Sequence, residues 1–136
     1  MVIDNAYLIF KADFGKRSWI DKIKSHIMLA PPPYRFKGSV AINDAAFTFK
    51  GYDEFSNEMV EFNIAKEDIN QLYHGYDETF NTFQTRGMGL TWAPIRIRFG
   101  SSNVDKEEND LYVVCGFNGA FSKNEALFEQ LKIWLS

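Results

Sequence analysis

The stretch YRFKGSVAI, residues 34–42, alternates between two kinds of side chain. Its even-numbered positions are aromatic, aliphatic or glycine, whereas most odd-numbered positions are polar. A period of two predicts a β-strand with one buried and one exposed face. Asn43 and Asp44 then predict a turn, and AAFTFKGY, residues 45–52, places Phe47 and Phe49 on one side. Two such strands joined by a short turn predict an antiparallel hairpin.

Similar segments follow along the chain. The candidate strands are MVEFNIA (59–65), INQLYHGYD (69–77) after a short KED break, PIRIRF (94–99) and LYVVCGF (111–117). The last of these is almost continuously apolar, so we expect it to be the most fully buried. Strands at this spacing, joined by short connections, favour an antiparallel meander over parallel units. The aromatic content of 16% agrees with a β-rich fold.

Two amphipathic helices are expected near the ends of the chain. The first begins at Ser18 and must end before the three prolines at 31–33. The second begins at Ser122, with Glu125 completing a capping box. Its apolar stripe consists of Leu127, Phe128, Leu131, Trp134 and Leu135. We therefore expect one domain, residues 1–136, in which 1–33 form a helical extension ending in Pro31–Pro33 and 34–136 form the core.

The composition argues against several classes of protein. The chain has 136 residues and a net charge of −3, so it lacks the broad basic surface that nucleic-acid binding requires. Its single cysteine, Cys115, precludes an internal disulfide and is expected in the core. No stretch approaches the roughly 18 apolar residues of a membrane span. The N-terminus lacks the basic region of a secretory signal, so we expect a cytoplasmic location.

Residues suited to catalysis or metal binding are scarce. His26 and His74 are the only histidines, and neither has a partner at metal-ligand spacing. Neither a nucleophile elbow nor a phosphate-binding loop is present. We therefore expect a protein that is not an enzyme and that has no catalytic residues, metal site or cofactor.

The order of elements resembles the pleckstrin-homology-like (PH-like) superfold, and within it the GRAM-like bacterial proteins. The resemblance covers about residues 34–136 and rests on FKGSVAIND-AAFTFKGY, EMVEFNIAKEDINQLYHGYD, IRIRF, LYVVCGF and SKNEALFEQLKIWL. It implies a mainly β fold, with a bent antiparallel sheet or partly open barrel capped by a C-terminal helix. Proteins of this superfold bind phosphoinositides, peptides or other proteins, and a shared fold does not choose among these functions.

The resemblance also allows the lipid-binding function to be weighed. Lipid-binding members carry lysine and arginine around the first hairpin loop. In this chain we expect the first hairpin loop at Ile42–Ala45, which contains no cation and one acidic residue. Binding of inositol phosphates there is therefore not expected. Docking of the first helix on a membrane surface is not expected either, because its apolar residues serve equally well to cover one end of the barrel.

Two groups of residues are candidates for binding a ligand or partner. The segment 79–94 contains Arg86, Met88, Leu90 and Trp92 beside two glycines, and it forms either an interaction loop or a hairpin that closes the barrel. Arg96 and Arg98 share one face of a strand. If their strand neighbours the one carrying Arg35 and Lys37, the four cations form a patch for a carboxylate or phosphate. The alternative is a solvated face paired with Glu61.

We expect a non-catalytic binding or interaction module that contacts a protein or peptide, or that self-associates as a homo-oligomer. The alternative is a carrier of a small hydrophobic or anionic ligand, or a weak lipid binder at a membrane surface. A carrier requires that Phe36, Phe47, Phe49 and Phe62 leave a cavity between them.

Overall fold

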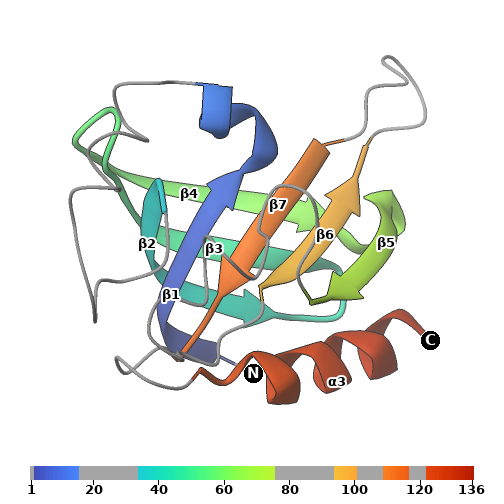
Figure 1. The fold of residues 1–136 in the computed structure, drawn as a ribbon. Coiled ribbons are helices and arrows are strands. Elements are labelled where there is room, and N and C mark those ends of the chain that lie inside the picture. The colour runs from blue at the N-terminus through green and yellow to red at the C-terminus, as the bar shows by residue number, and fades with distance from the viewer. Residues whose placement is uncertain (1, 16–33, 76–93, 101–108, 117–121) are drawn as a thin grey trace.

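The computed structural model describes residues 2–15, 34–75, 94–100, 109–116 and 122–136. Within these residues, seven antiparallel strands form one sheet in the order β4-β3-β2-β1-β7-β6-β5 (Figure 1). The elements are β1 (Val2–Phe10), the short 3-10 helix η1 (Lys11–Gly15), β2 (Phe36–Ile42), β3 (Ala46–Asp53), β4 (Glu58–Ala65), the 3-10 turn η2 (Lys66–Asp68), β5 (Ile69–His74), β6 (Ile95–Phe99), β7 (Asn109–Val114) and the helix α3 (Asn124–Leu135). The expected antiparallel, mainly β fold is confirmed.

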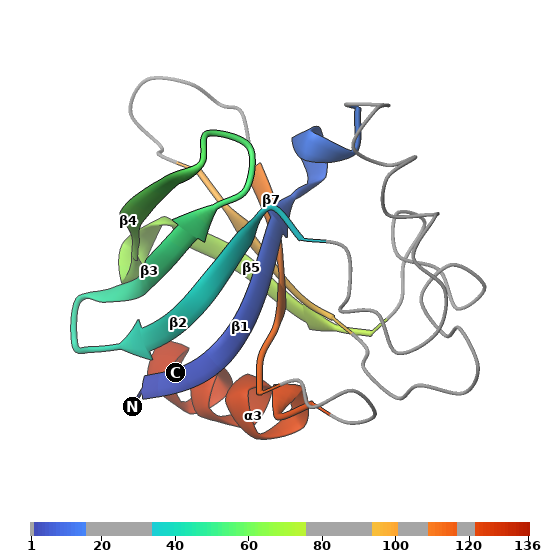
Figure 2. The ribbon, with the colours of Figure 1, turned by 90° about the vertical axis from the view of Figure 1, so that its left-hand side faces the viewer.

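The sheet is strongly curled. Strands β4 and β5 are consecutive in the chain and joined only by η2, yet they occupy opposite edges of the sheet. The sheet must therefore bend round on itself, and Figure 2 shows the resulting half-barrel with α3 across one open end. Because β4 and β5 do not pair, the described sheet has two edges rather than a closed wall.

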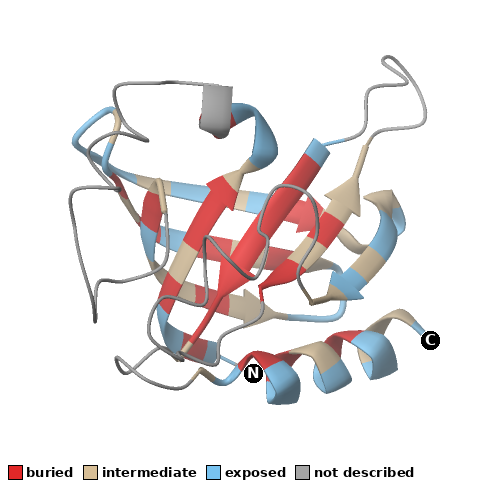
Figure 3. Cartoon of the chain, viewed as in Figure 1, coloured by how far each residue is buried: buried red, intermediate tan, exposed pale blue. Residues whose placement is uncertain are grey.

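The concave side of the sheet holds the core, as the alternation predicts. Phe47 and Phe49 are fully buried and belong to the same core cluster as Phe36 and Val40 of β2. Figure 3 shows the buried positions alternating with more exposed ones along the strands. Strand β7 is buried from Asp110 to Val114, in agreement with its apolar sequence.

A pair of glycines lets β2 and β3 approach closely. Gly38 and Gly51 oppose each other in the register of the two strands. A Cβ atom at Gly38 would lie 2.2 Å from the Lys50 carbonyl oxygen, and one at Gly51 would lie 2.6 Å from the Phe49 ring. Only glycine fits at these two positions, where the sheet bends around the phenylalanines.

The apolar stripe of α3 covers the open end of the half-barrel, as predicted. Leu127 and Leu131 are fully buried, and Phe128 and Trp134 pack against the same core. The Trp134 indole Nε1 also donates a hydrogen bond to the Asn43 carbonyl, 2.7 Å away, which ties the helix to the β2–β3 turn.

The start of α3 differs from the prediction. Lys123, not Ser122, occupies the N-cap and its side chain forms no capping hydrogen bond, although Ser122 Oγ accepts a hydrogen bond from the Asn124 N–H (3.3 Å). Asn124 instead turns toward β7, where its Oδ1 accepts a hydrogen bond from the Cys115 N–H (2.8 Å) and its Nδ2 donates to the Val113 carbonyl (3.3 Å). The buried amide thus fastens the helix to the strand, and this contact takes the place of the expected capping box.

The N-terminal residues also require a correction. We expected residues 1–33 to lie outside the sheet, but Val2–Phe10 forms β1, which pairs with β2 on one side and β7 on the other. This segment is therefore a central strand. The helix expected from Ser18 to the prolines lies outside the described residues. Within the described residues, no helix has the length and hydropathy needed to cross a membrane.

Candidate functional site

The four cations proposed as a patch do not meet. Arg35 and Lys37 belong to the β2 side of the sheet, whereas Arg96 and Arg98 lie on β6, and β1 and β7 separate the two strands. Three strand spacings correspond to about 14 Å. The prediction of a shared anion site is therefore wrong, because the strands are not neighbours.

Arg35 forms part of an ion-pair cluster at one end of the sheet. Its Nε and Nη2 donate to the two carboxylate oxygens of Asp53 at 3.1 and 3.0 Å, and its Nη1 donates to Asp13 at 3.1 Å. Both carboxylates are buried, and the guanidinium lies over the rings of Phe36 and Phe55. This geometry ties η1 to the β2 and β3 ends and leaves Arg35 a structural residue.

The other three cations are also engaged in contacts along the sheet. Arg98 pairs across the β6–β7 ladder with Asp110, with Nε to Oδ1 at 2.8 Å. Arg96 donates to Gln71 at 3.0 Å and lies over Tyr73. Lys37 lies 5.7 Å from the centre of the Tyr7 ring. The expected pairing of these cations with Glu61 is not found, since the ion-pair partner of Glu61 is Lys50, at 3.9 Å.

Two further expectations concern the segment 79–94 and the loop Ile42–Ala45. Arg86, Met88, Leu90 and Trp92 lie outside the described residues. The turn at Asn43 and Asp44 joins β2 to β3, so the first hairpin connection is not Ile42–Ala45 but the segment after β1. The expectation about lipid binding, which took Ile42–Ala45 as the first hairpin loop, stays a prediction.

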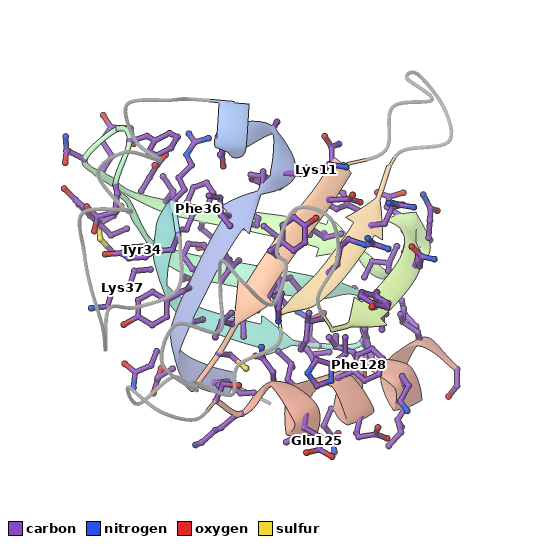
Figure 4. All side chains as sticks on the ribbon, viewed as in Figure 1. Lys11, Tyr34, Phe36, Lys37, Glu125 and Phe128 are labelled. Carbon is purple, nitrogen blue, oxygen red and sulfur yellow. The ribbon has the colours of Figure 1, made fainter. Side chains whose placement is uncertain are left out.

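A groove with a volume of about 650 Å³ lies between the β5 edge and the C-terminal part of α3. Its residues come from three elements: η2, β5 and the last turn of the helix. They are Lys66, Glu67, Ile69, Asn70, Gln71, Leu72, Lys132, Leu135 and Ser136. Figure 4 shows the side chains that project between the strand and the helix, around the labelled Phe128. The groove therefore combines apolar walls with two ammonium groups and one carboxylate.

The contacts around the groove fix its shape. The Lys66 N–H donates to the Ala45 carbonyl at 2.9 Å, which holds η2 against the β2–β3 turn. The Lys66 ammonium lies 5.7 Å from the Trp134 ring, and Trp134 is itself bonded to Asn43. At the other end, the His74 and Phe128 rings lie 5.2 Å apart. Strand and helix are thus held side by side while the space between them remains open.

Strand β5 pairs with β6 along one edge, and no other described strand lies along its second edge. Gly75 donates to the Pro94 carbonyl at 3.1 Å, so this opposed pair is hydrogen-bonded. Bonded and non-bonded pairs alternate in an antiparallel ladder. Leu72 and His74, opposite Ile97 and Ile95, are consequently non-bonded pairs whose N–H and C=O groups point away from β6. Leu72 lines the groove, and His74 lies near α3, with its ring 5.2 Å from that of Phe128.

Sequence reasoning missed this groove. The sequence predicts INQLYHGYD, residues 69–77, as a strand, but nothing in it indicates an edge strand. The one relevant feature of the sequence is the KED break. In the structure it joins two consecutive strands that do not pair with each other but lie at opposite edges of the sheet.

The reactive side chains described in the structure offer little chemistry. Burial raises the pKa of the Cys115 thiol to about 12, so it stays protonated at neutral pH. Among the described residues, no cluster of three His, Cys, Asp or Glu side chains could hold a metal ion. The sequence matches no protein-family model and no curated protein.

Proposed function

We propose that the chain is a non-catalytic interaction module of the PH-like kind, and that it binds an extended peptide segment of a partner protein along β5, beside α3. The main support is the groove along an unpaired strand edge. An added strand would accept and donate hydrogen bonds at Leu72 and His74, and main-chain bonds of this kind provide much of the affinity in strand addition.

The lining predicts the character of the peptide. Alternate side chains of an added strand point to opposite faces, so one set would meet the apolar groups of Ile69, Leu72 and Leu135. Lys66 lies at the same groove beside Glu67, whereas the Lys132 ammonium is already paired with Glu129 at 2.9 Å. We therefore expect alternating apolar residues, with an acidic residue where the peptide passes Lys66.

The packing of the core favours surface binding over carriage of a ligand inside the barrel. The Phe36, Phe49 and Phe62 rings lie 5.2–5.7 Å apart, centre to centre, in edge and tilted contacts. Phe10 contacts two of them as well, at 5.8 Å. These rings occupy the space that a hydrophobic ligand would need.

The proposal is tested by selecting peptides from a random phage-displayed library and measuring their binding by fluorescence polarisation. Amide exchange then locates the site: the Leu72 and His74 N–H groups should become protected, whereas Tyr73, already paired to β6, should change little. Leu72→Pro removes one outward donor and should weaken binding at least about tenfold. Asn63→Pro on β4 is the matched control and should leave peptide binding unchanged.

Two results would contradict the proposal. One is the absence of any selected binder. The other is protection of β4 amides, or of none in the sheet, when a selected peptide binds. Inositol hexakisphosphate, titrated under the same conditions, tests anionic-ligand binding directly, and protection confined to the segment after β1 would favour that function instead.

A further inference from the structure

The second sheet edge, β4, is long, regular and exposed. Its eight residues pair with β3 without any register shift, and it contains no proline. Met59 is 75% exposed, and Glu58, Glu61 and Asn63 are exposed too. Natural edge strands are usually shortened, bulged or covered to prevent pairing with another chain. Within the described residues, β4 has no such protection apart from its acidic side chains.

The outward backbone groups of β4 follow from its ladder with β3. The bond from the Lys66 N–H to the Ala45 carbonyl makes that opposed pair hydrogen-bonded. By alternation, the N–H and C=O groups of Met59, Glu61, Asn63 and Ala65 point away from β3. Any strand added to this edge must form its hydrogen bonds with those four residues.

We propose that β4 pairs antiparallel with β4 of a second copy of this chain, with the two-fold axis at Phe62. This register places Glu61 opposite Asn63 of the second copy and Met59 opposite Ala65, which satisfies all the outward groups. On the concave face, Val60 meets Ile64 of the second copy and the two Phe62 rings meet at the axis. Each of these pairs brings together side chains that are compatible across a sheet.

Charge complementarity favours a second copy of the chain as the partner of β4, and it favours this register over the alternatives. Continued one residue past β4 into η2, this register places Glu58 opposite Lys66 of the other chain, and the symmetry produces this pair at both ends. Moving the axis to Glu61 places two carboxylates face to face, and moving it to Asn63 removes the pairing of Glu58 with Lys66. A shift of a single residue turns the apolar face outward. The segment EMVEFNIAK, residues 58–66, is therefore complementary to itself in one register.

The first test is the solution mass of the full chain, measured by light scattering and sedimentation from about 1 to about 100 μM, because a small interface of this kind predicts micromolar affinity. We expect a dimer of twice 15.7 kDa. Asn63→Pro removes an N–H that β3 does not use, together with the side-chain hydrogen bond from Thr48 Oγ1 to Asn63 Oδ1 (2.7 Å). The dimer should be lost, whereas the circular dichroism spectrum and melting temperature of the monomer should match those of Asn63→Ala, which loses the same side-chain hydrogen bond. Asn63→Ala, which retains the N–H, should still dimerise.

The second test addresses the register. Glu58→Lys alone and Lys66→Glu alone each place like charges at both ends of the homodimer, and each should raise the dissociation constant about tenfold. An equimolar mixture of the two variants restores opposite charges at both ends and should form heterodimers with wild-type affinity, detected by energy transfer between labelled chains.

A monomer at about 100 μM would overturn the proposal, as would a dimer that survives Asn63→Pro or a mixture of the two charge variants that fails to form heterodimers. Peptide binding at β5 is measured separately, so either proposal can fail alone.

Discussion

At the scale of single residues, the most constrained group is the cluster of Asp13, Arg35 and Asp53. The guanidinium binds two buried carboxylates that come from η1 and from the end of β3. Asp13 also accepts from the Phe10 N–H at 3.1 Å, and Asp53 from the Phe55 N–H at 2.9 Å. These hydrogen bonds offset the free-energy cost of removing the two carboxylates from water. The cluster therefore fixes where the chain leaves β1 and enters β2.

The cluster predicts a pH dependence of stability. Burial by itself raises the pKa of Asp53, but hydrogen bonds from Arg35 and from the Phe55 N–H outweigh it, and the net pKa lies below the usual value. A depressed carboxyl pKa contributes stability above the unfolded value of about 4, and this contribution is lost as the pH falls through the folded pKa. Asp53→Asn should lower the free energy of unfolding by about 2 kcal/mol at pH 7.

The measurement is urea unfolding of wild type and Asp53→Asn from neutral pH to about pH 2. The difference between them should shrink below about pH 4. Glu61→Gln is the control, because the Lys50–Glu61 pair is 3.9 Å apart and more than half exposed at both ends. That variant should differ from wild type by less than about 1 kcal/mol. A difference for Asp53→Asn that is constant over the whole range would contradict the assigned role.

At the scale of elements, α3 shows what periodicity can and cannot predict. Its stripe follows from the 100° spacing of apolar residues; in the structure Leu127 and Leu131 are fully buried, and Phe128 and Trp134 are partly buried against the same core. Its first turn was predicted wrongly because the decisive partner is distant in space: Lys123 N–H donates to the Cys115 carbonyl at 2.8 Å, and Asn124 binds β7. A capping box is a local signal, and the hydrogen bonds to β7 prevail over it.

Two α3 side chains test the docking of this helix. Leu131 is fully buried against the core, so Leu131→Ala should lower the free energy of unfolding by about 2–5 kcal/mol. Ile133 is 67% exposed on the same helix, and Ile133→Ala should change it by less than about 0.5 kcal/mol. Chemical denaturation of both variants measures the contrast. Equal effects would mean that α3 does not cover the half-barrel in the way described.

At the scale of the whole molecule, the order of strands decides which features are functional candidates. The alternation of β2, β3 and β4 could be read from the sequence, but β1 could not. A register shift between Ile3 and Ala6, with Asn5 at a φ of 55°, breaks the period of two within that strand. The edges of the sheet depend on the position of β1, so the groove at β5 could not be predicted without it.

The central position of β1 leads to a prediction about the whole fold. If residues 34–136 formed an independent core, a chain beginning at Tyr34 would fold. In the structure, β1 supplies the ladder that joins β2 to β7, together with the fully buried Leu8 and Ala6. Without it, the sheet divides into β2–β4 and β5–β7, each with an uncovered core face. We expect the 34–136 chain to show no cooperative thermal transition by circular dichroism.

A matched pair of point variants separates the loss of β1 from the loss of chain length. Leu8→Ala in the full chain should lower the free energy of unfolding by about 3 kcal/mol, because Leu8 is completely buried between the two halves of the sheet. Val2→Ala, at a position that is 69% exposed on the same strand, should cost less than about 0.5 kcal/mol. Cooperative unfolding of the 34–136 chain with a wild-type midpoint would show that β1 is an addition to the fold. Loss of that transition, together with a large effect at Leu8 alone, would establish β1 as the strand that holds the two halves of the sheet together.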